Sequence, residues 1–229
     1  MTVGEGTQGG IRRNRLTETG GGESSRDYAY RGTARTWDDG YFWGPITAFL
    51  DQEAPPPRRL LEVGCGNGFA AKRLTELGYE VTGIEPSSTA ILFACENCPT
   101  GRFIHASAYD PLPDDCGPFD IVLSIEVVEH VLFPREFAAR LFAALRPGGI
   151  GILTTPFHGW FKNVAIAVSG RFDSHVNPLW EGGHVKFFSP RTIGTLLRDA
   201  GFTDIDVRRA GRVPALAKSM VVSFRKGLD

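Results

Sequence analysis

The stretch Leu60-Leu-Glu-Val-Gly-Cys-Gly-Asn-Gly-Phe69 decides how this chain folds. It reads as an apolar strand that runs directly into a loop with glycines at positions 64, 66 and 68. Because glycine has no Cβ, such a loop can turn tightly and let a ligand approach its backbone. The G-x-G-x-G spacing differs from the G-x-G-x-x-G loop that cradles a pyrophosphate. Glu62, at the end of the strand, would repel a phosphate, so the loop favours a cationic or amine-bearing ligand.

The sequence around this loop alternates short apolar strands with helical segments. The second strand, Tyr79-Glu-Val-Thr-Gly-Ile-Glu85, ends in an acid where doubly wound sheets present a carboxylate to a ribose. The alternation predicts an α/β fold, a doubly wound and mostly parallel sheet with helices on both faces. We expect strands at about 60–63, 80–84, 102–105, 119–125, 149–155, 205–207 and 219–224, and helices at about 46–50, 68–78, 88–97, 134–145 and 190–201.

With these elements in place, the chain resembles the class I S-adenosylmethionine-dependent methyltransferases over roughly residues 35–225. The resemblance implies a seven-stranded Rossmann-like sheet whose seventh strand is antiparallel, with an N-terminal helical cap. It also implies S-adenosylmethionine as the cofactor and a small-molecule acceptor for its methyl group. An unrelated doubly wound domain is the alternative. The motifs that carry the resemblance, in family order, are E-V-G-C-G-N-G at 62–68, G-I-E at 83–85, F-D-I-V at 119–122 and L-R-P-G-G at 145–149.

By this resemblance, the acid and glycines of the first loop hold the methionine and ribose parts of the cofactor, and Glu85 clamps the ribose. Many relatives carry an Asp after the third strand to accept from the adenine amino group. This chain has Ser107 there, which can still accept a hydrogen bond. The expected cofactor residues are Glu62, Gly64, Cys65, Gly66, Gly68, Glu85, Pro86, Ser107, Ala108, Ser124 and Ile125.

A second group of residues, Glu126-Val-Val-Glu-His130, follows the fourth expected strand. If it forms a helical turn, positions i, i+3 and i+4 share a face, and two carboxylates and an imidazole converge. The segment Trp180-Glu-Gly-Gly-His-Val-Lys-Phe-Phe-Ser-Pro190 could bring His184 over the same cleft. Two Glu oxygens and two His nitrogens suit Mg²⁺, Mn²⁺ or a similar cation. We therefore expect four catalytic and metal-binding residues, unless the acids only cap a helix or hold the strand end: Glu126, Glu129, His130 and His184.

The pattern E-x-x-E-H with a distant His resembles two metal-using branches of the family. One is the ubiquinone-pathway O-methyltransferases, which act on a catechol, and the other is the small-RNA 2′-O-methyltransferases, which act on a terminal vicinal diol. The Gly-Gly-His-x-Lys-Phe segment at 182–187 is nearer the first branch. A divalent ion would orient the acceptor and lower its hydroxyl pKa. In a metal-free enzyme, His130 or His184 would be the general base.

An insertion at about 157–188 is the expected lid over the acceptor. Its apolar stretch could pack on the core as a helix, which we favour, cover an apolar acceptor, or make a weak contact with a membrane surface. Residues expected to face the substrate are Trp37, Tyr41, His158 and Phe161.

Length and composition limit the alternatives. A chain of 229 residues with 42% hydrophobic content fits one domain, at 27–229, after a flexible tail at 1–26. A net charge of −1 provides no basic field for nucleic acid, so nucleic acid is not an expected partner. The four cysteines form no disulfide or zinc pattern, which favours reduced thiols in the cytoplasm. We see no signal peptide and no apolar run near the ~20 residues of a membrane span.

These observations predict methylation of a hydroxyl on a small aromatic, catechol or diol-bearing acceptor, with a divalent metal as an assisting cofactor. The first alternative is metal-free transfer to nitrogen or carbon. The second is a non-catalytic protein that binds S-adenosylmethionine as a partner or sensor. Nothing in the sequence indicates an oligomeric state.

Overall fold

The computed structural model describes residues 40–53, 55–56, 58–177, 179–180, 182–213 and 217–228. Seven strands form one sheet in the order β3-β2-β1-β4-β5-β7-β6. Strands β1 to β5 pair in parallel, and β7 is antiparallel to both of its neighbours. The predicted doubly wound sheet is therefore confirmed. The strands are β1 (Arg59–Val63), β2 (Glu80–Glu85), β3 (Arg102–His105), β4 (Phe119–Ile125), β5 (Leu145–Pro156), β6 (Phe202–Ala210) and β7 (Ser219–Lys226).

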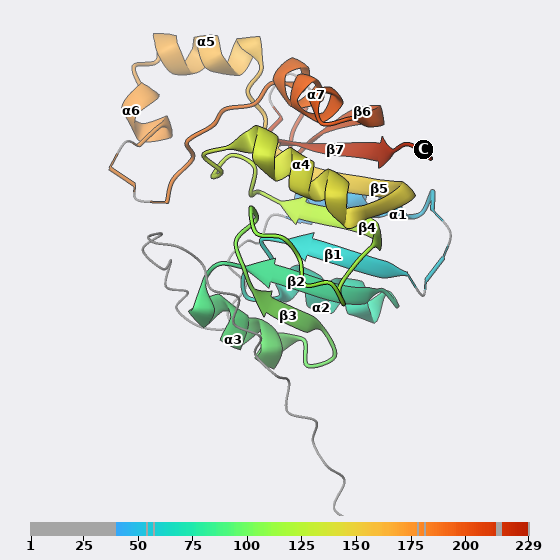
Figure 1. Ribbon diagram of the computed structural model, residues 1–229. Helices are drawn as coiled ribbons and strands as arrows, with labels where there is room; N and C mark the ends of the chain where they lie inside the picture. The colour runs from blue at the N-terminus through green and yellow to red at the C-terminus, as the bar shows by residue number, and fades with distance from the viewer. Residues whose placement is uncertain are drawn as a thin grey trace, which may run out of the picture.

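Helices cover both faces of the sheet (Figure 1). Successive strand residues alternate between the faces, so Leu60 packs with the helices of one face and Leu61 with those of the other. The first face carries α1, α2 and α3, and the second carries α4 and α7. The helical elements are η1 (Gly40–Phe42), α1 (Trp43–Leu50), α2 (Phe69–Glu76), α3 (Ser88–Asn97), α4 (Pro134–Ala144), α5 (Trp160–Val168), α6 (Phe172–His175) and α7 (Pro190–Asp199).

Local sequence signals fix where the helices start. Ser189 accepts from the Thr192 amide, and the Thr192 hydroxyl accepts from the Ser189 amide at 2.9 Å. This reciprocal capping box, with Pro190 at the first helical position, begins α7 at the predicted residue. Ser87 caps α3 in a simpler way, since its hydroxyl accepts from the Ala90 amide.

The carboxyl ends of the five parallel strands lie at one edge of the sheet. The strand order reverses between β1 and β4, because β1 continues to β2 on one side and β4 leads to β5 on the other. In open α/β sheets, ligands bind at such a switch point, outside the carboxyl ends of the strands. The fold thus directs attention to the loops after β1, β2 and β4.

The insertion after β5 differs from the interpretation that its helix packs on the core. Helix α5 has no buried residue, and Trp160 and Val168 are 71% and 82% exposed. Figure 1 shows α5 and α6 projecting away from the sheet. The interpretation was wrong because an apolar stretch does not reveal whether anything in the same chain covers it.

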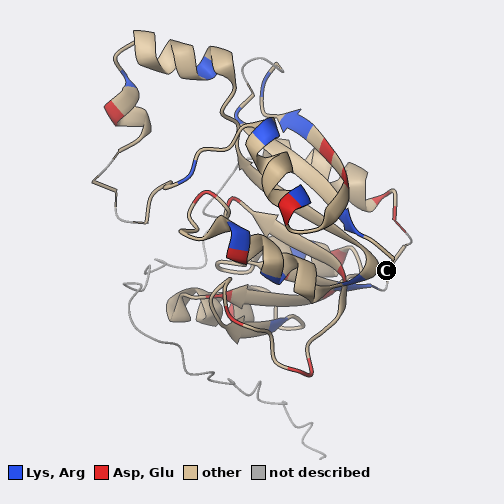
Figure 2. Cartoon of the chain, turned by 45° about the horizontal axis from the view of Figure 1, so that its top comes forward, with Lys and Arg blue, Asp and Glu red and all other residues tan. Residues whose placement is uncertain are grey.

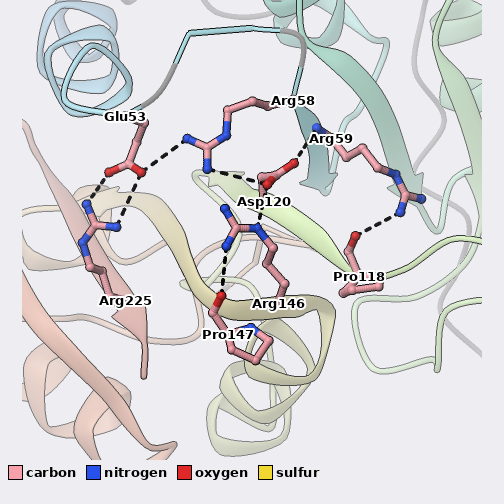
Figure 3. Close-up of polar contacts among 8 residues, drawn as sticks. All are labelled: Glu53, Arg58, Arg59, Pro118, Asp120, Arg146, Pro147 and Arg225. Carbon is pink, nitrogen blue, oxygen red and sulfur yellow. Dashed lines mark hydrogen bonds and ion pairs between the residues drawn. The ribbon is translucent and has the colours of Figure 1, made fainter. Parts of the chain in front are cut away.

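The opposite edge of the sheet is held by an ion-pair network (Figure 3). Asp120, in β4, accepts from the Arg146 side chain at 2.7 Å and from the Arg59 amide at 3.0 Å. Arg58 lies 3.6 Å from the same carboxylate and 3.3 Å from Glu53. Glu53 also pairs with Arg225 of β7. The network thereby joins Glu53, which follows α1, to strands β1, β4, β5 and β7, at the end of the sheet away from the candidate site.

Some expectations fall outside the described residues, namely the tail at 1–26 and Trp37. Within the part of the chain that the structure describes, no helix is long and apolar enough to cross a membrane. All four cysteines are free thiols. Acidic and basic residues are interspersed along the chain (Figure 2).

Candidate active site

The glycine loop between β1 and α2 packs closely against its neighbours. Gly64, Gly66 and Gly68 have positive φ angles of 74°, 51° and 78°. A Cβ on Gly64 would lie 2.4 Å from Cγ2 of Val127, and a Cβ on Gly68 would lie 2.8 Å from Cα of Ala94. Conformation and contact therefore both require glycine at these two positions. The contact with Val127 brings the loop beside the turn that follows β4.

Two buried acids lie next to the loop. Glu85 accepts from the Gly66 amide at 3.1 Å through Oε2 and from the Ser87 amide at 3.0 Å through Oε1. A carboxylate can accept more than one hydrogen bond, so a ribose hydroxyl could donate to Glu85 as well. Burial, and then the charge of Glu85, raises the pKa of Glu62 to about 8 despite a backbone hydrogen bond from Ala71. Oε2 of Glu62 accepts no hydrogen bond from the described residues, so it suits a cationic ligand group.

The remaining residues expected at the cofactor also lie at or near the carboxyl edge, with different exposures. Cys65 is buried, and burial raises its thiol pKa well above the usual value. Pro86 follows β2, and Ala108 lies half-buried in the loop after β3. Ile125 ends β4 and packs partly buried against the core. Ser124 is buried inside the sheet, where its hydroxyl donates to the Val63 carbonyl at 3.2 Å.

Asp110 is a residue that sequence reasoning missed. Its Oδ2 accepts from the Ser107 amide at 2.7 Å, and its own amide donates to the Ser107 carbonyl at 3.1 Å. The turn thus holds a carboxylate beside Ser107. The available signal was an Asp three residues after Ser107, a spacing at which an Asp side chain can close a turn.

Three of the four expected metal ligands come together. One ligand atom from each of Glu129, His130 and His184 lies within 4.8 Å of the other two. Glu129 is 1% exposed, and neither carboxylate oxygen accepts a hydrogen bond from the described residues. Burial, and then the charge of the neighbouring Glu126, raises the Glu129 pKa well above its usual range, although its own backbone amide and the nearby Thr155 hydroxyl act in the opposite direction.

Backbone hydrogen bonds bring His184 to this place from a distant part of the chain. The amides of Val185 and Lys186 both donate to the Glu129 carbonyl at 2.9 Å. The His130 and His184 rings meet edge to face, with centroids 4.8 Å apart. Trp180 packs against both rings, with its ring centroid 6.4 Å from that of His130 and 5.6 Å from that of His184. The segment after α6 therefore wraps around the turn that follows β4.

His130 is oriented by two carbonyl groups. Its Nδ1 lies 2.8 Å from the Gly182 carbonyl and 3.2 Å from the Gly183 carbonyl. Since a carbonyl can only accept, Nδ1 carries the proton and Nε2 keeps its lone pair. Burial lowers the His130 pKa, although these carbonyls act in the opposite direction. Burial, followed by the nearby His130, lowers the His184 pKa to about 4. Both imidazoles are therefore neutral near pH 7.

The predicted helical turn over 126–130 is wrong. Glu126 has a positive φ of 53°, and the His130 amide donates to the Val127 carbonyl at 2.9 Å, three residues back, instead of to Glu126 as in an α-helix. The Glu126 carboxylate accepts from the Thr154 hydroxyl at 2.8 Å, and it is not part of the three-residue cluster. A left-handed residue directly after β4 redirects the chain, so the expected i, i+3, i+4 face does not exist.

His158 follows β5 in a second group of basic side chains. Its ring lies 5.4 Å from that of His175, and its Nδ1 lies 3.1 Å from Oδ1 of Asn163. Burial, and then the charge of Lys162, lowers its pKa to about 4. Lys162 was given no role from the sequence, yet its ammonium is half-buried here and donates to the Phe157 carbonyl at 2.9 Å.

Two other residues expected at the substrate, Tyr41 and Phe161, lie in different elements from each other. Tyr41 is at the carboxyl edge, where its hydroxyl lies 3.2 Å from Oγ of Ser219, the partner of Pro156 at the end of β5. Phe161 lies on α5 and is 63% exposed.

The chemistry of the three-residue cluster fits a divalent cation. An ionised carboxylate buried without hydrogen bonds is costly unless a cation compensates it. A neutral imidazole whose second nitrogen donates to a carbonyl is the usual form of a metal-binding histidine. One carboxylate and two imidazoles form a mixed oxygen and nitrogen donor set, which suits Mn²⁺ or another borderline cation better than Mg²⁺.

Comparison with known families identifies one match over most of the chain. The family described as "Methyltransferase domain" matches residues 34–207. This range contains the glycine loop, both buried acids and the cluster after β4.

Curated proteins named "Ubiquinone biosynthesis O-methyltransferase" are similar to part of the chain. The protein from Caulobacter sp. (strain K31) is 38% identical over 116 residues, which are 49% of this chain and 46% of that protein. The protein from Maricaulis maris (strain MCS10) is 32% identical over 151 residues, or 63% of this chain and 59% of that protein. The chain thus spans about half the length of the curated relatives it matches.

Solved structures share the fold at low sequence identity. A putative methyltransferase from Bacillus halodurans C-125 superposes with a TM-score of 0.63 at 14% identity, over 80% of this chain and 99% of the other. Phosphoethanolamine N-methyltransferase 2 from Haemonchus contortus, solved with S-adenosyl-L-methionine, gives a TM-score of 0.61 at 18% identity, over 81% of this chain and 53% of the other. At these identities the likeness shows the fold alone.

Proposed function

This chain belongs to the S-adenosylmethionine-dependent methyltransferases, and from that membership we propose that it methylates a hydroxyl oxygen of a small catechol or diol-bearing acceptor. The observation that carries the proposal is the buried Glu129 carboxylate, unpaired among the described residues and beside His130 and His184 at the switch-point edge. A divalent cation held there would act next to the cofactor loop, whose Gly64 contacts the same turn through Val127.

The residues at the ends of β1 and β2 are suited to hold the cofactor. The Glu85 carboxylate would accept from the ribose hydroxyls, and Asp110 and Ser107 lie where the adenine amino group would find an acceptor. Glu62 would balance the positive charge of the cofactor, and this charge would in turn favour its ionised form. When bound, S-adenosylmethionine supplies a methyl group on a sulfonium sulfur, which departs as a neutral thioether.

In this proposal Glu129, His130 and His184 hold the metal. His130 and His184 would bind through neutral imidazole nitrogens, and Glu129 would provide the negative charge. When bound, the cation would supply Lewis acidity towards the acceptor hydroxyl and fix the direction of its lone pair. Mn²⁺ is favoured over Mg²⁺ because two of the three donors are imidazoles.

The protein's contribution to transfer is positioning and deprotonation. The acceptor oxygen forms a bond to the methyl carbon while the carbon–sulfur bond breaks and its electron pair stays on sulfur. The cation would lower the pKa of the acceptor hydroxyl, so the hydroxyl proton would leave to solvent.

A hydroxyl acceptor is favoured over nitrogen or carbon for two reasons. The relatives that cover half of this chain are named as O-methyltransferases, and a catechol or vicinal diol offers the adjacent oxygens that a cation can bind together. In a metal-free enzyme for nitrogen or carbon acceptors, His184 or His130 would be the base, because both hold a lone pair near pH 7.

The proposal includes a division of the chain into a tail at 1–26 and one domain at 27–229, with the insertion at 157–188 as the acceptor-facing part. Tyr41, His158 and Phe161 belong to its acceptor side, as does Lys162. Action in the cytoplasm and on a small molecule is also part of the proposal.

Methyl transfer from labelled S-adenosylmethionine to a panel of acceptors tests this function. We expect turnover of catechols, strong loss of activity with a chelator, and recovery with Mn²⁺. Glu129→Gln should abolish the metal-dependent rate, whereas His175→Ala should retain it. Turnover of amines that a chelator leaves unchanged would contradict the proposal, and no turnover at all would favour a non-catalytic binding protein.

A further inference from the structure

A cavity of about 440 Å³ lies beyond His158, at the junction of β5, α5, α7 and β6. This volume is within the range of sites for small organic ligands. Its wall is largely aromatic, with Phe157, Trp160 and Phe161 contributed by the end of β5 and the start of α5.

The described residues that line the cavity include two cationic side chains. They are Arg191, on the first turn of α7, and Arg209, on β6, and none of the described lining residues is acidic. The Arg209 guanidinium lies over the Phe157 ring at 4.9 Å from the centroid, so its plane is held against the aromatic wall. Arginine is the side chain best shaped to bind a planar carboxylate or a similar anion.

The cavity is joined to the three-residue cluster by one residue and one segment. His158 lines the cavity and also contacts Phe187, with ring centroids 4.9 Å apart. Its amide donates to the Phe188 carbonyl at 3.1 Å. The short segment from His184 to Ser189 therefore runs from the cluster to the cavity wall.

We infer that this cavity binds the part of the acceptor remote from the reacting hydroxyl, and that Arg191 and Arg209 select acceptors that carry an anionic group there. The inference rests on the proposed function for its acceptor class. It adds the chemistry of the substituent: an aromatic or apolar connection that ends in a carboxylate or another anion.

Calorimetric binding of matched acid and amide pairs tests the inference. The probes are 3,4-dihydroxybenzoate and 3,4-dihydroxycinnamate, each with its uncharged primary amide, added to the full chain with Mn²⁺ and S-adenosylhomocysteine. The two acids carry the carboxylate at different distances from the catechol ring, so comparing them measures how far the carboxylate must extend to meet the arginines. We expect the better acid to bind about tenfold more tightly than its amide, because a hydrogen bond to a charged group is worth roughly this factor.

The variants Arg191→Met and Arg209→Met, alone and combined, should remove the preference for the acid and leave amide binding unchanged. Methionine keeps the apolar stem, so the aromatic wall retains a packing partner. Arg135→Met is the matched control, since Arg135 is 82% exposed and pairs with Asp199 at the other end of α7. It should leave both affinities unchanged.

Equal binding of acid and amide by the native chain would overturn the inference, as would an acid preference that survives both arginine substitutions. Methylation of neutral catechols together with equal binding would leave the proposed function intact and remove only the cavity site. An arginine-dependent acid preference without any catechol methylation would keep the site and remove the proposed acceptor class.

Discussion

Glu129 has both carboxylate oxygens buried without a hydrogen bond from any described residue, next to two imidazoles that are neutral near pH 7. Leaving a buried acceptor unpaired costs about 1–3 kcal/mol, and more for a charged group. Burial without a cation therefore disfavours the ionised carboxylate, in agreement with its raised pKa. A cation would compensate its charge and recover this free energy on binding.

The carbonyls that orient His130 lead to a prediction about metal affinity. Gly182 has a φ of 79°, so Gly182→Ala would strain the turn and shift the carbonyl that accepts from Nδ1. Loss of such an outer partner typically weakens metal binding by about 10–100-fold. We expect weaker Mn²⁺ binding by titration and unchanged binding of S-adenosylhomocysteine.

Gly170→Ala is the control for that substitution. Gly170 also has a positive φ, of 66°, but a Cβ added there would meet no atom of the described residues within 4 Å. It should share the conformational cost and keep full Mn²⁺ affinity. Equal effects of the two substitutions would show that the orientation of His130 is unimportant.

The raised pKa of Glu62 predicts how cofactor affinity depends on pH. Its pKa of about 8 means that the acid holds a proton at neutral pH in the free protein, whereas a bound sulfonium favours the carboxylate. Affinity for S-adenosylmethionine should therefore rise up to about pH 8 and then level off. Glu62→Gln should flatten this rise, measured against Glu80→Gln, which removes an exposed acid at the start of β2.

The proton on Glu62 also makes the free energy of unfolding depend on pH, in the direction opposite to that of cofactor affinity. Between the ordinary value of 4.5 and about 8, the folded protein holds a proton that the unfolded chain has released. The free energy of unfolding should therefore fall as pH rises through this window, and Glu62→Gln should remove that part of the slope. An identical slope in both proteins would contradict the assigned pKa.

At the scale of elements, the sequence predicted the sheet and the helices well, for a physical reason. Short apolar segments that end in Gly, Glu or Ser are typical of buried parallel strands. Ser189-Pro190 is a local signal for the start of a helix, and it needs no tertiary contact. The sixth strand was expected at 205–207 but covers Phe202–Ala210, with positive φ at Asp204 and a register shift that interrupt its pattern.

The candidate site was less predictable, because its geometry depends on contacts between distant segments. The sequence singled out Glu129, His130 and His184, but it did so on the condition of a helical turn that the left-handed Glu126 prevents. The two amides that hold His184 in place belong to backbone atoms, which carry no sequence signal. Lys162 was missed for a similar reason, since its role depends on where α5 begins in space.

The ion-pair network at the amino edge provides a prediction about the elements it joins (Figure 3). Partial burial disfavours the Asp120 carboxylate, but hydrogen bonds from Arg146 and the Arg59 amide outweigh this and lower its pKa. Asp120→Asn should reduce the free energy of unfolding at neutral pH by about 1–3 kcal/mol. Because the folded pKa is depressed, the difference should shrink as pH falls below about 4.

Chemical denaturation at several pH values measures this effect. Asp115→Asn is the matched control, because Asp115 pairs with Arg102 at 3.0 Å on the surface and should contribute little. Cofactor affinity should be unchanged in both variants, since the network lies at the edge opposite the glycine loop. A pH-independent loss in Asp120→Asn would contradict the role of its charge.

At the scale of the whole molecule, stability and chemistry are separated along the strands. The amino edge holds the ion pairs, and the carboxyl edge holds the glycine loop, the three-residue cluster and the aromatic cavity. Helices α5 and α6 extend from the carboxyl edge (Figure 1). Trp160, Val168 and Phe172, which lie on them, are each more than half exposed.

The exposed face of α5 predicts weak binding to a membrane surface. Val164 and Val168 are 42% and 82% exposed on this helix, and Lys162 lies on it as well. Flotation with phosphatidylcholine vesicles that contain phosphatidylglycerol should recover part of the protein, and Val164→Ser with Val168→Ser should reduce that part. Leu179→Ser, at an 88% exposed residue outside α5, should not. Absence of vesicle binding by the native chain would remove this prediction.

The most direct measurement of the central claim is Mn²⁺ binding by electron paramagnetic resonance in the presence of S-adenosylhomocysteine. We predict one bound ion in the native chain and in His175→Ala, and strongly weakened binding in Glu129→Gln and His184→Ala. Intact circular dichroism of each variant would exclude unfolding as the cause. A native chain that binds no Mn²⁺, or variants that bind it as well as the native chain, would contradict the claim that Glu129, His130 and His184 form a metal site.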